Sequence, residues 1–220
     1  HPALKRDNLE IRSGCKAHKV LFENDKATGI EFSKKGRVEK IYASREVILC
    51  GGAINSPQLL QLSGVGPADH LKKIDIPVVA DRPGVGENLQ DHLEVYVQYE
   101  SKKPISLYPS LQPFGRLKVG LEWIFSRTGP GSTNHFETGG FIRSKAGIEH
   151  PNLQFHFLPL AINYDGSSPA GGHGFQAHVG PMRPTSRGHV RIKSNDPGKH
   201  PEILFNYMAT ENDREEMRDA

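Results

Sequence analysis

The sequence predicts a mixed fold in two parts: an incomplete α/β domain over residues 1–86, and an α+β domain with a mainly antiparallel sheet over residues 87–220. In the first part, an apolar run, a glycine pair and a helical pattern follow one another, which is the order of an α/β unit. A stretch rich in Pro and Gly at 77–86 marks the crossing between the domains. Beyond it, short runs of alternating polarity dominate, as in antiparallel sheets.

The first elements predict a small antiparallel meander. Residues 8–13 are a candidate first strand. Three further strands are expected at 20–22, 28–32 and 38–42. Polar turns at 24–25 and 35–36 separate them, and such turns between apolar runs are typical of hairpins.

The next pattern joins a strand to a helix. Residues 46–50 form a continuous apolar run, which predicts a strand buried on both faces. A glycine pair follows at 51–52, and Ser56 with Pro57 predicts a helix that begins at one of these two residues and ends near Gly64. In open α/β sheets, ligands bind at such turns. A tight turn that only packs the strand against the helix needs the same residues.

The remaining elements are expected in chain order. A short helix is predicted at 67–74, and the second part is expected to place a helix at 114–125 on its sheet. The strands of that sheet are predicted at 95–97, 153–158, 175–179 and 189–192.

Composition excludes some classes of function. The 220 residues carry a formal net charge of +3, and the basic residues are scattered, so nucleic-acid binding is not expected. A weak attraction to an anionic membrane surface, and hence peripheral membrane association, stays open. The cysteines Cys15 and Cys50 lie in no CxxC or Cys/His cluster, and no histidines have metal-ligand spacing, so neither a disulfide scaffold nor a metal site is expected.

One segment resembles a known family in detail. Residues 52–66, GAINSPQLLQLSGVG, match at every defined position the second signature of the glucose–methanol–choline (GMC) oxidoreductases. The resemblance continues through residues 84–92, GVGENLQDH, and reaches both ends of the chain. Three further segments are similar to the choline-oxidising members of that family: ETGGFIRS at 137–144, QFHFLP at 154–159 and HVGPMR at 178–183.

The resemblance implies an FAD-binding domain, in part, over 1–86 and an incomplete substrate domain over 87–220. It implies oxidation of choline to betaine aldehyde by hydride transfer to the flavin, with the electron acceptor unknown. It also implies an intracellular protein, cytoplasmic or membrane-associated in a bacterium and mitochondrial in a eukaryote. The residues that correspond to positions near FAD are Ala17, whose backbone would meet the adenine, and Gly51, Gly52, Ala53 and Ser56.

Two motifs of the family are missing from the 220 residues. One is the nucleotide-binding GxGxxG, and the other is the C-terminal histidine motif that supplies the general base. We therefore expect that the chain is the middle of an enzyme, that it holds no catalytic residue, and that the isolated piece is colourless and inactive.

The resemblance also implies substrate-binding residues. Glu94 matches the carboxylate that faces the trimethylammonium group of choline, a cation that cannot donate hydrogen bonds and is held by charge and aromatic faces. His156 and His92 match histidines in and beside the pocket, and Phe136 matches an aromatic wall. Each residue also has an ordinary structural alternative. Glu94 could be a solvated surface residue, and His156 a buried structural histidine. His92 could stabilise the interdomain turn, and Phe136 could be part of the core. Two other functions stay open: oxidation of another primary alcohol, and a non-catalytic binding protein with the same fold.

Overall fold

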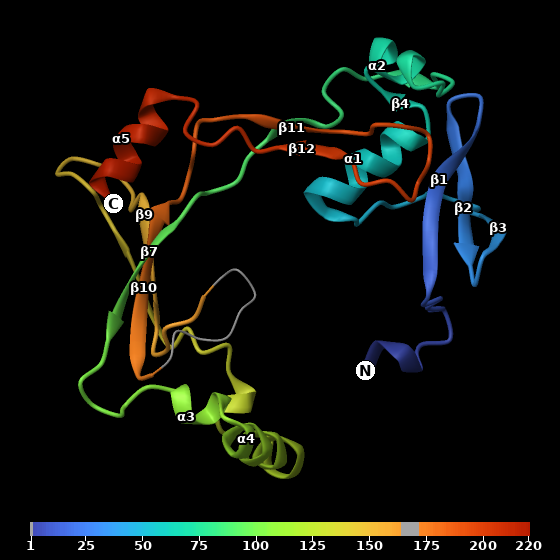
Figure 1. Cartoon of the computed structure of the whole chain (residues 1–220). Helices are drawn as coiled ribbons and strands as arrows, with labels where there is room; N and C mark the ends of the chain where they lie inside the picture. Colours follow the sequence, from blue (N-terminus) through green and yellow to red (C-terminus); the bar gives the residue numbers. More distant parts are fainter. Residues whose placement is uncertain (1, 164–171) are drawn as a thin grey trace. The chain divides into compact units, whose positions relative to one another are not determined.

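The computed structural model describes residues 2–163 and 172–220 and divides into two compact units (Figure 1). The first unit comprises the described residues up to Gln90 together with Arg187–Asn206. The second comprises the described residues from Asp91 to Ser186 together with Tyr207–Ala220. Both units are therefore discontinuous in sequence. The segment 187–206, which the sequence placed in the second part, packs in the first.

The first unit begins with the expected meander. After a 3₁₀ turn at Pro2–Lys5, strands β1 (Cys15–Glu23), β2 (Lys26–Lys34) and β3 (Arg37–Tyr42) pair antiparallel in chain order. Its turns contain Asn24, Lys35 and Gly36 with positive φ, as the turn residues predicted. The candidate strand at 8–13 is wrong, because these residues form no strand.

The segment before the first α-helix differs from the prediction. Residues 46–50 form no strand, Ile48 is 70% exposed, and Cys50 is exposed. A strand needs a hydrogen-bonded neighbour, and none of the described strands pairs with this run. The apolar composition of residues 46–50 is that of a buried strand, but the segment lacks the hydrogen-bonded neighbour that a strand requires.

Helix α1 (Gly52–Leu62) begins four residues earlier than predicted. Gly52 has a φ of 73°, so the chain turns into the helix at the glycine pair rather than at Ser56. The Ser56 hydroxyl instead accepts a hydrogen bond from the Gly51 amide at 3.0 Å. Pro57 lies in the middle of the helix, where it lacks the amide hydrogen that another residue would donate. Gly64 follows the helix end with a φ of 84°, as expected.

A buried glutamine holds the returning segment 187–206 on α1. The Gln61 side chain is fully buried; its amide donates to the Val190 carbonyl at 2.8 Å and its oxygen accepts from the Ile192 amide at 3.1 Å. A Cβ on Gly86 would overlap both the Val190 carbonyl oxygen and the Gln61 amide, so this strand–helix approach requires glycine. Buried polar groups that are matched in this way fix register.

Short elements complete the first unit. Helix α2 (Ala68–Lys73) lies where the short helix was predicted. Its residue Leu71 forms a small core with Ile76 and Ile192. Strands β4 (Val65–Gly66) and β5 (Ala80–Asp81) pair in parallel. An antiparallel sheet has the order β12 (Glu202–Leu204), β11 (Gly188–Arg191) and β6 (Glu87–Leu89).

The second unit is built on an antiparallel sheet. Its order is β7 (Val95–Glu100), β10 (Gly174–Pro181), β9 (Leu153–Leu158) and β8 (Thr138–Ile142). This sheet contains the strands predicted at 95–97, 153–158 and 175–179; the strand predicted at 189–192 lies in the first unit, and β8 was not predicted. The mixed α/β fold with antiparallel sheets is thus confirmed. Successive side chains in a strand point to opposite faces, so residues paired across all four strands share one face.

The helices of this unit depart from the prediction in their packing. Helix α4 (Pro113–Ser126) extends one residue beyond the predicted helix at each end. Its main contacts are with α3 (Tyr108–Leu111) and the 3₁₀ turn Pro130–Ser132. No residue of α4 is buried. Helix α5 (Glu211–Asp219) contacts β10, so α5 rather than α4 packs on the sheet.

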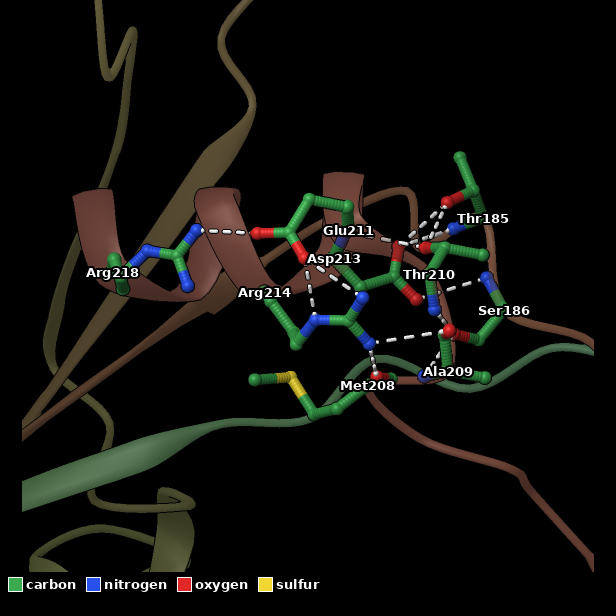
Figure 2. A network of polar contacts seen from close by, with 9 residues as sticks. All are labelled: Thr185, Ser186, Met208, Ala209, Thr210, Glu211, Asp213, Arg214 and Arg218. Carbon is green, nitrogen blue, oxygen red and sulfur yellow. Dashed lines mark hydrogen bonds and ion pairs between the residues drawn. The ribbon is translucent and has the colours of Figure 1, made fainter.

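The N-terminus of α5 is fixed by a buried carboxylate (Figure 2). Asp213 is 3% exposed and accepts hydrogen bonds from the backbone amides of Thr185 and Ser186 at 2.6 and 2.9 Å, and from the Thr185 hydroxyl at 2.9 Å. Thr210 caps the helix by accepting from the Asp213 amide. Burial opposes ionisation of Asp213, but the hydrogen bonds from Ser186 and Thr185 outweigh it and hold its pKa well below the ordinary range.

Candidate active site

One face of the second unit's sheet carries a row of ring-bearing side chains. Tyr96 on β7 pairs with His178 on β10, His178 pairs with His156 on β9, and His156 pairs with Gly139 on β8. The Tyr96 and His178 rings stack with centroids 5.3 Å apart. Phe136, just before β8, meets His156 and His178 edge-on at 5.7 and 5.8 Å. The row therefore forms a continuous wall of rings.

Glu94 places a carboxylate beside this wall. Its Oε1 lies 2.8 Å from Nδ1 of His178, which is 1% exposed. The Glu94 side chain itself remains 41% exposed. The Glu94 carboxylate is thus held by His178 through Oε1, while the exposed part of the side chain is accessible to a ligand.

The segment 91–94 that presents Glu94 is held at two points. The Tyr207 hydroxyl donates to the Asp91 carboxylate, and burial together with this bond raises the pKa of Tyr207 to about 12, so the donor stays protonated. A Cβ on Gly180 would clash with the Leu93 carbonyl oxygen and lie 3.1 Å from the Cα of Glu94. Glycine at 180 therefore lets this segment run against β10.

The structure thus brings together Glu94, His156 and Phe136, three of the residues expected to bind substrate. His92 is exposed and lies two residues ahead of Glu94, outside the row of rings. Sequence reasoning missed Tyr96 and His178 as site residues. A signal was available, since Gln176 and His178 alternate along a strand whose other residues are small or apolar.

A second candidate site lies in the first unit, in a cavity of about 450 Å³. Three of the expected cofactor residues line it, namely Ala17, Gly51 and Ser56, whereas Gly52 and Ala53 are not among its lining residues. The walls are mainly apolar, from Ile30, Ile48, Leu49, Leu59 and Leu62.

This cavity fits one end of a flavin nucleotide. A slot with mainly apolar walls suits a planar aromatic base. Ala17, Gly51 and Ser56 are the residues that would hold it.

Two searches over the described residues gave no site. No group of three or more His, Cys, Asp or Glu side chains there has the arrangement of a metal site. Within the same residues, no helix has the length and apolar character needed to cross a membrane.

Comparison with known proteins defines the class. Residues 1–94 and 184–220 match the GMC oxidoreductase family, and the chain belongs to it. The chain is 57% identical, over 99% of its length, to the oxygen-dependent choline dehydrogenase of Cronobacter sakazakii, and 58% identical, over 98%, to that of Pectobacterium carotovorum. It spans 39% and 38% of the lengths of these relatives.

A solved structure agrees with the fold. The formate oxidase of Aspergillus oryzae, determined in a study of FAD modification, superposes with a TM-score of 0.84 at 25% sequence identity. The match covers 93% of this chain and 41% of that one. The mixed α/β fold of this chain therefore resembles that of a solved oxidase.

Proposed function

We propose that the protein containing this chain is an FAD-dependent oxidoreductase that oxidises choline to betaine aldehyde. The observation that supports this most directly is the pairing of Glu94 with a wall of rings from Tyr96, Phe136, His156 and His178. A carboxylate beside aromatic faces suits a quaternary ammonium ion, which is bound by charge and by ring quadrupoles. The names of the curated relatives favour the same substrate.

The roles of the residues follow from their chemistry. FAD, when bound, accepts the hydride from the alcohol carbon. Ala17, Gly51 and Ser56 hold one end of that cofactor, with Gly52 and Ala53 in the same turn. Glu94 attracts the trimethylammonium group, Phe136 and Tyr96 supply ring surface, and His156 lies in the same row. His92 borders the site. Each of these contributions orients a reactant and needs no proton transfer.

The full-length protein tests this proposal directly. We expect a yellow protein whose flavin absorbance bleaches on addition of choline under anaerobic conditions, and which then turns over with oxygen or a quinone analogue. Running both acceptors identifies the electron acceptor. A protein that reduces its flavin with a neutral primary alcohol and not with choline would favour the alternative of a different alcohol substrate. A full-length protein that binds no flavin would favour the non-catalytic alternative.

We further propose peripheral contact with an anionic membrane surface through α4. One stripe of this helix exposes large apolar side chains, from Phe114, Leu117, Leu121 and Phe125. Lys118 lies beside this stripe and lines the same surface hollow. An amphipathic helix of this kind binds at the lipid interface and depends on anionic lipids. The intracellular location, cytoplasmic or membrane-associated in a bacterium or mitochondrial in a eukaryote, stays a prediction.

Vesicle sedimentation checks the role of α4. We expect the full-length protein to pellet with vesicles containing phosphatidylglycerol and not with phosphatidylcholine alone. The double variant Phe114→Ser/Phe125→Ser should lose most of this binding, since those side chains are 86% and 82% exposed. Ile105→Ser is the matched control, because Ile105 is 76% exposed outside α4. Equal loss in both variants, or no vesicle binding by the unaltered protein, would contradict the proposal.

A further inference from the structure

Behind Glu94 lies a buried chain of hydrogen-bonding side chains. Gln98 on β7 contacts the Gln176 Oε1 through its amide nitrogen at 2.8 Å. The Gln176 Nε2 lies 2.7 Å from the His178 Nε2, and the His178 Nδ1 lies 2.8 Å from the Glu94 Oε1. Gln176 is fully buried and His178 is 1% exposed. The chain therefore runs from the interior to the exposed carboxylate.

The direction of each hydrogen bond in this chain is fixed by a backbone amide. The Ile162 N–H donates to the Gln176 Oε1 at 3.0 Å, so that atom is an acceptor and the other end of the amide is the donor. The Gln176 Nε2 then donates to the His178 Nε2, which must be unprotonated. The His178 proton is therefore on Nδ1 and is donated to Glu94. His178 is neutral in this arrangement, and Glu94 is the acceptor.

We propose that His178 is a positioning residue that presents Glu94 to the substrate as a full negative charge. A charged imidazolium at 178 would neutralise the carboxylate, and a neutral ring with its proton on Nε2 would turn a lone pair toward it. The Gln176 amide excludes both states as long as it keeps the bond from Ile162. His178 thereby sets the preference for cationic over neutral alcohols. This inference rests on the proposed function.

Two substitutions separate this role from a structural one. His178→Asn keeps an amide donor near the position of Nδ1, whereas His178→Phe keeps the ring that stacks on Tyr96 and removes the donor. In the full-length enzyme we compare kcat/KM for choline with that for its neutral isostere, 3,3-dimethylbutan-1-ol. His178→Phe should lower the choline value roughly tenfold, mainly through KM, since one hydrogen bond to a charged group is lost. The neutral alcohol should change by less than about threefold. His178→Asn removes one ring of the wall but keeps the donor, so it should retain more of the choline value than His178→Phe does.

The outcomes distinguish this inference from the proposed function. Equal losses on both alcohols in His178→Phe, or no loss on choline, would overturn the role of His178 while leaving choline as the substrate. An unaltered enzyme that does not prefer choline over its isostere would instead overturn the proposed function.

If His178→Phe does not fold, a measurement on the unaltered enzyme still tests the proposed protonation of His178. Nitrogen-15 NMR of labelled histidines, with the His178 signal assigned from His178→Asn, should show a neutral ring with its proton on Nδ1. A signal from the Nε2–H form or from imidazolium would overturn the inference.

Discussion

Glu94→Gln is expected to weaken choline binding at least ~30-fold in the full-length enzyme, because breaking one side of a partly desolvated ion pair costs at least about 2 kcal/mol. The substitution is well suited to the site. A glutamine oxygen can still accept the hydrogen bond that His178 donates to Glu94. The variant therefore removes the negative charge and keeps the anchoring contact. Steady-state kinetics with choline measure the effect as a rise in KM.

The neutral isostere 3,3-dimethylbutan-1-ol is the control for Glu94→Gln. It has the shape of choline without the charge, so its KM should change far less. Equal losses on both alcohols would indicate a folding defect and would assign Glu94 a structural role. No loss on choline would remove the main physical support for choline as the substrate.

Asp213→Asn is expected to destabilise the second unit by about 2–4 kcal/mol at neutral pH, because it leaves a buried donor without an acceptor. The carboxylate accepts from two backbone amides, those of Thr185 and Ser186, on different oxygens (Figure 2). An asparagine has only one oxygen to offer, so its NH₂ group must face one of these amides. Hydrogen exchange of α5 in the full-length protein should show the loss locally.

The effect of Asp213 should depend on pH in a defined direction. Its pKa is depressed in the folded state, so its contribution is fully present above the unfolded pKa of about 4. It is lost progressively as the pH falls below that value toward the folded pKa. The difference in unfolding free energy between the unaltered protein and Asp213→Asn should therefore shrink between about pH 4 and pH 2.

Glu211→Gln is the matched control for Asp213→Asn. Glu211 lies on the same helix and its ion pairs with Arg214 and Arg218 are exposed. Solvent screens such pairs, so this variant should unfold close to the unaltered protein. A loss as large as that of Asp213→Asn would show that α5 depends on its charge in general rather than on the buried carboxylate.

Much of the candidate site was accessible from the sequence. Glu94, His156 and Phe136 were identified through segments that resemble the GMC family, and the structure places all three in one cluster. The series of hydrogen-bonded side chains from Gln98 through Gln176 to His178 was not identified. Its members come from β7 and β10, which are more than 70 residues apart in sequence, so only strand pairing makes them neighbours.

The first unit shows where local pattern fails. The apolar run at 46–50 has the composition of a buried strand, but burial and pairing depend on neighbours that a local pattern does not contain. Ser56 and Pro57 are good helix-start residues, yet α1 begins at Gly52 because positive φ there already turns the chain. The first error arose because pairing depends on distant parts of the chain, and the second because a neighbouring glycine pair outweighed the helix-start residues.

The sequence by itself determined the family, the meander β1–β3, helix α4 and three strands of the second unit's sheet, β7, β9 and β10. These depend on periodicity and turn chemistry, which act over a few residues. Only the tertiary structure decided that residues 187–206 return to the first unit, through the two hydrogen bonds of the buried Gln61. Only it decided which nitrogen of His178 carries the proton, since the Ile162 amide sets that choice through Gln176. Buried polar groups must find partners, and those partners are distant in sequence.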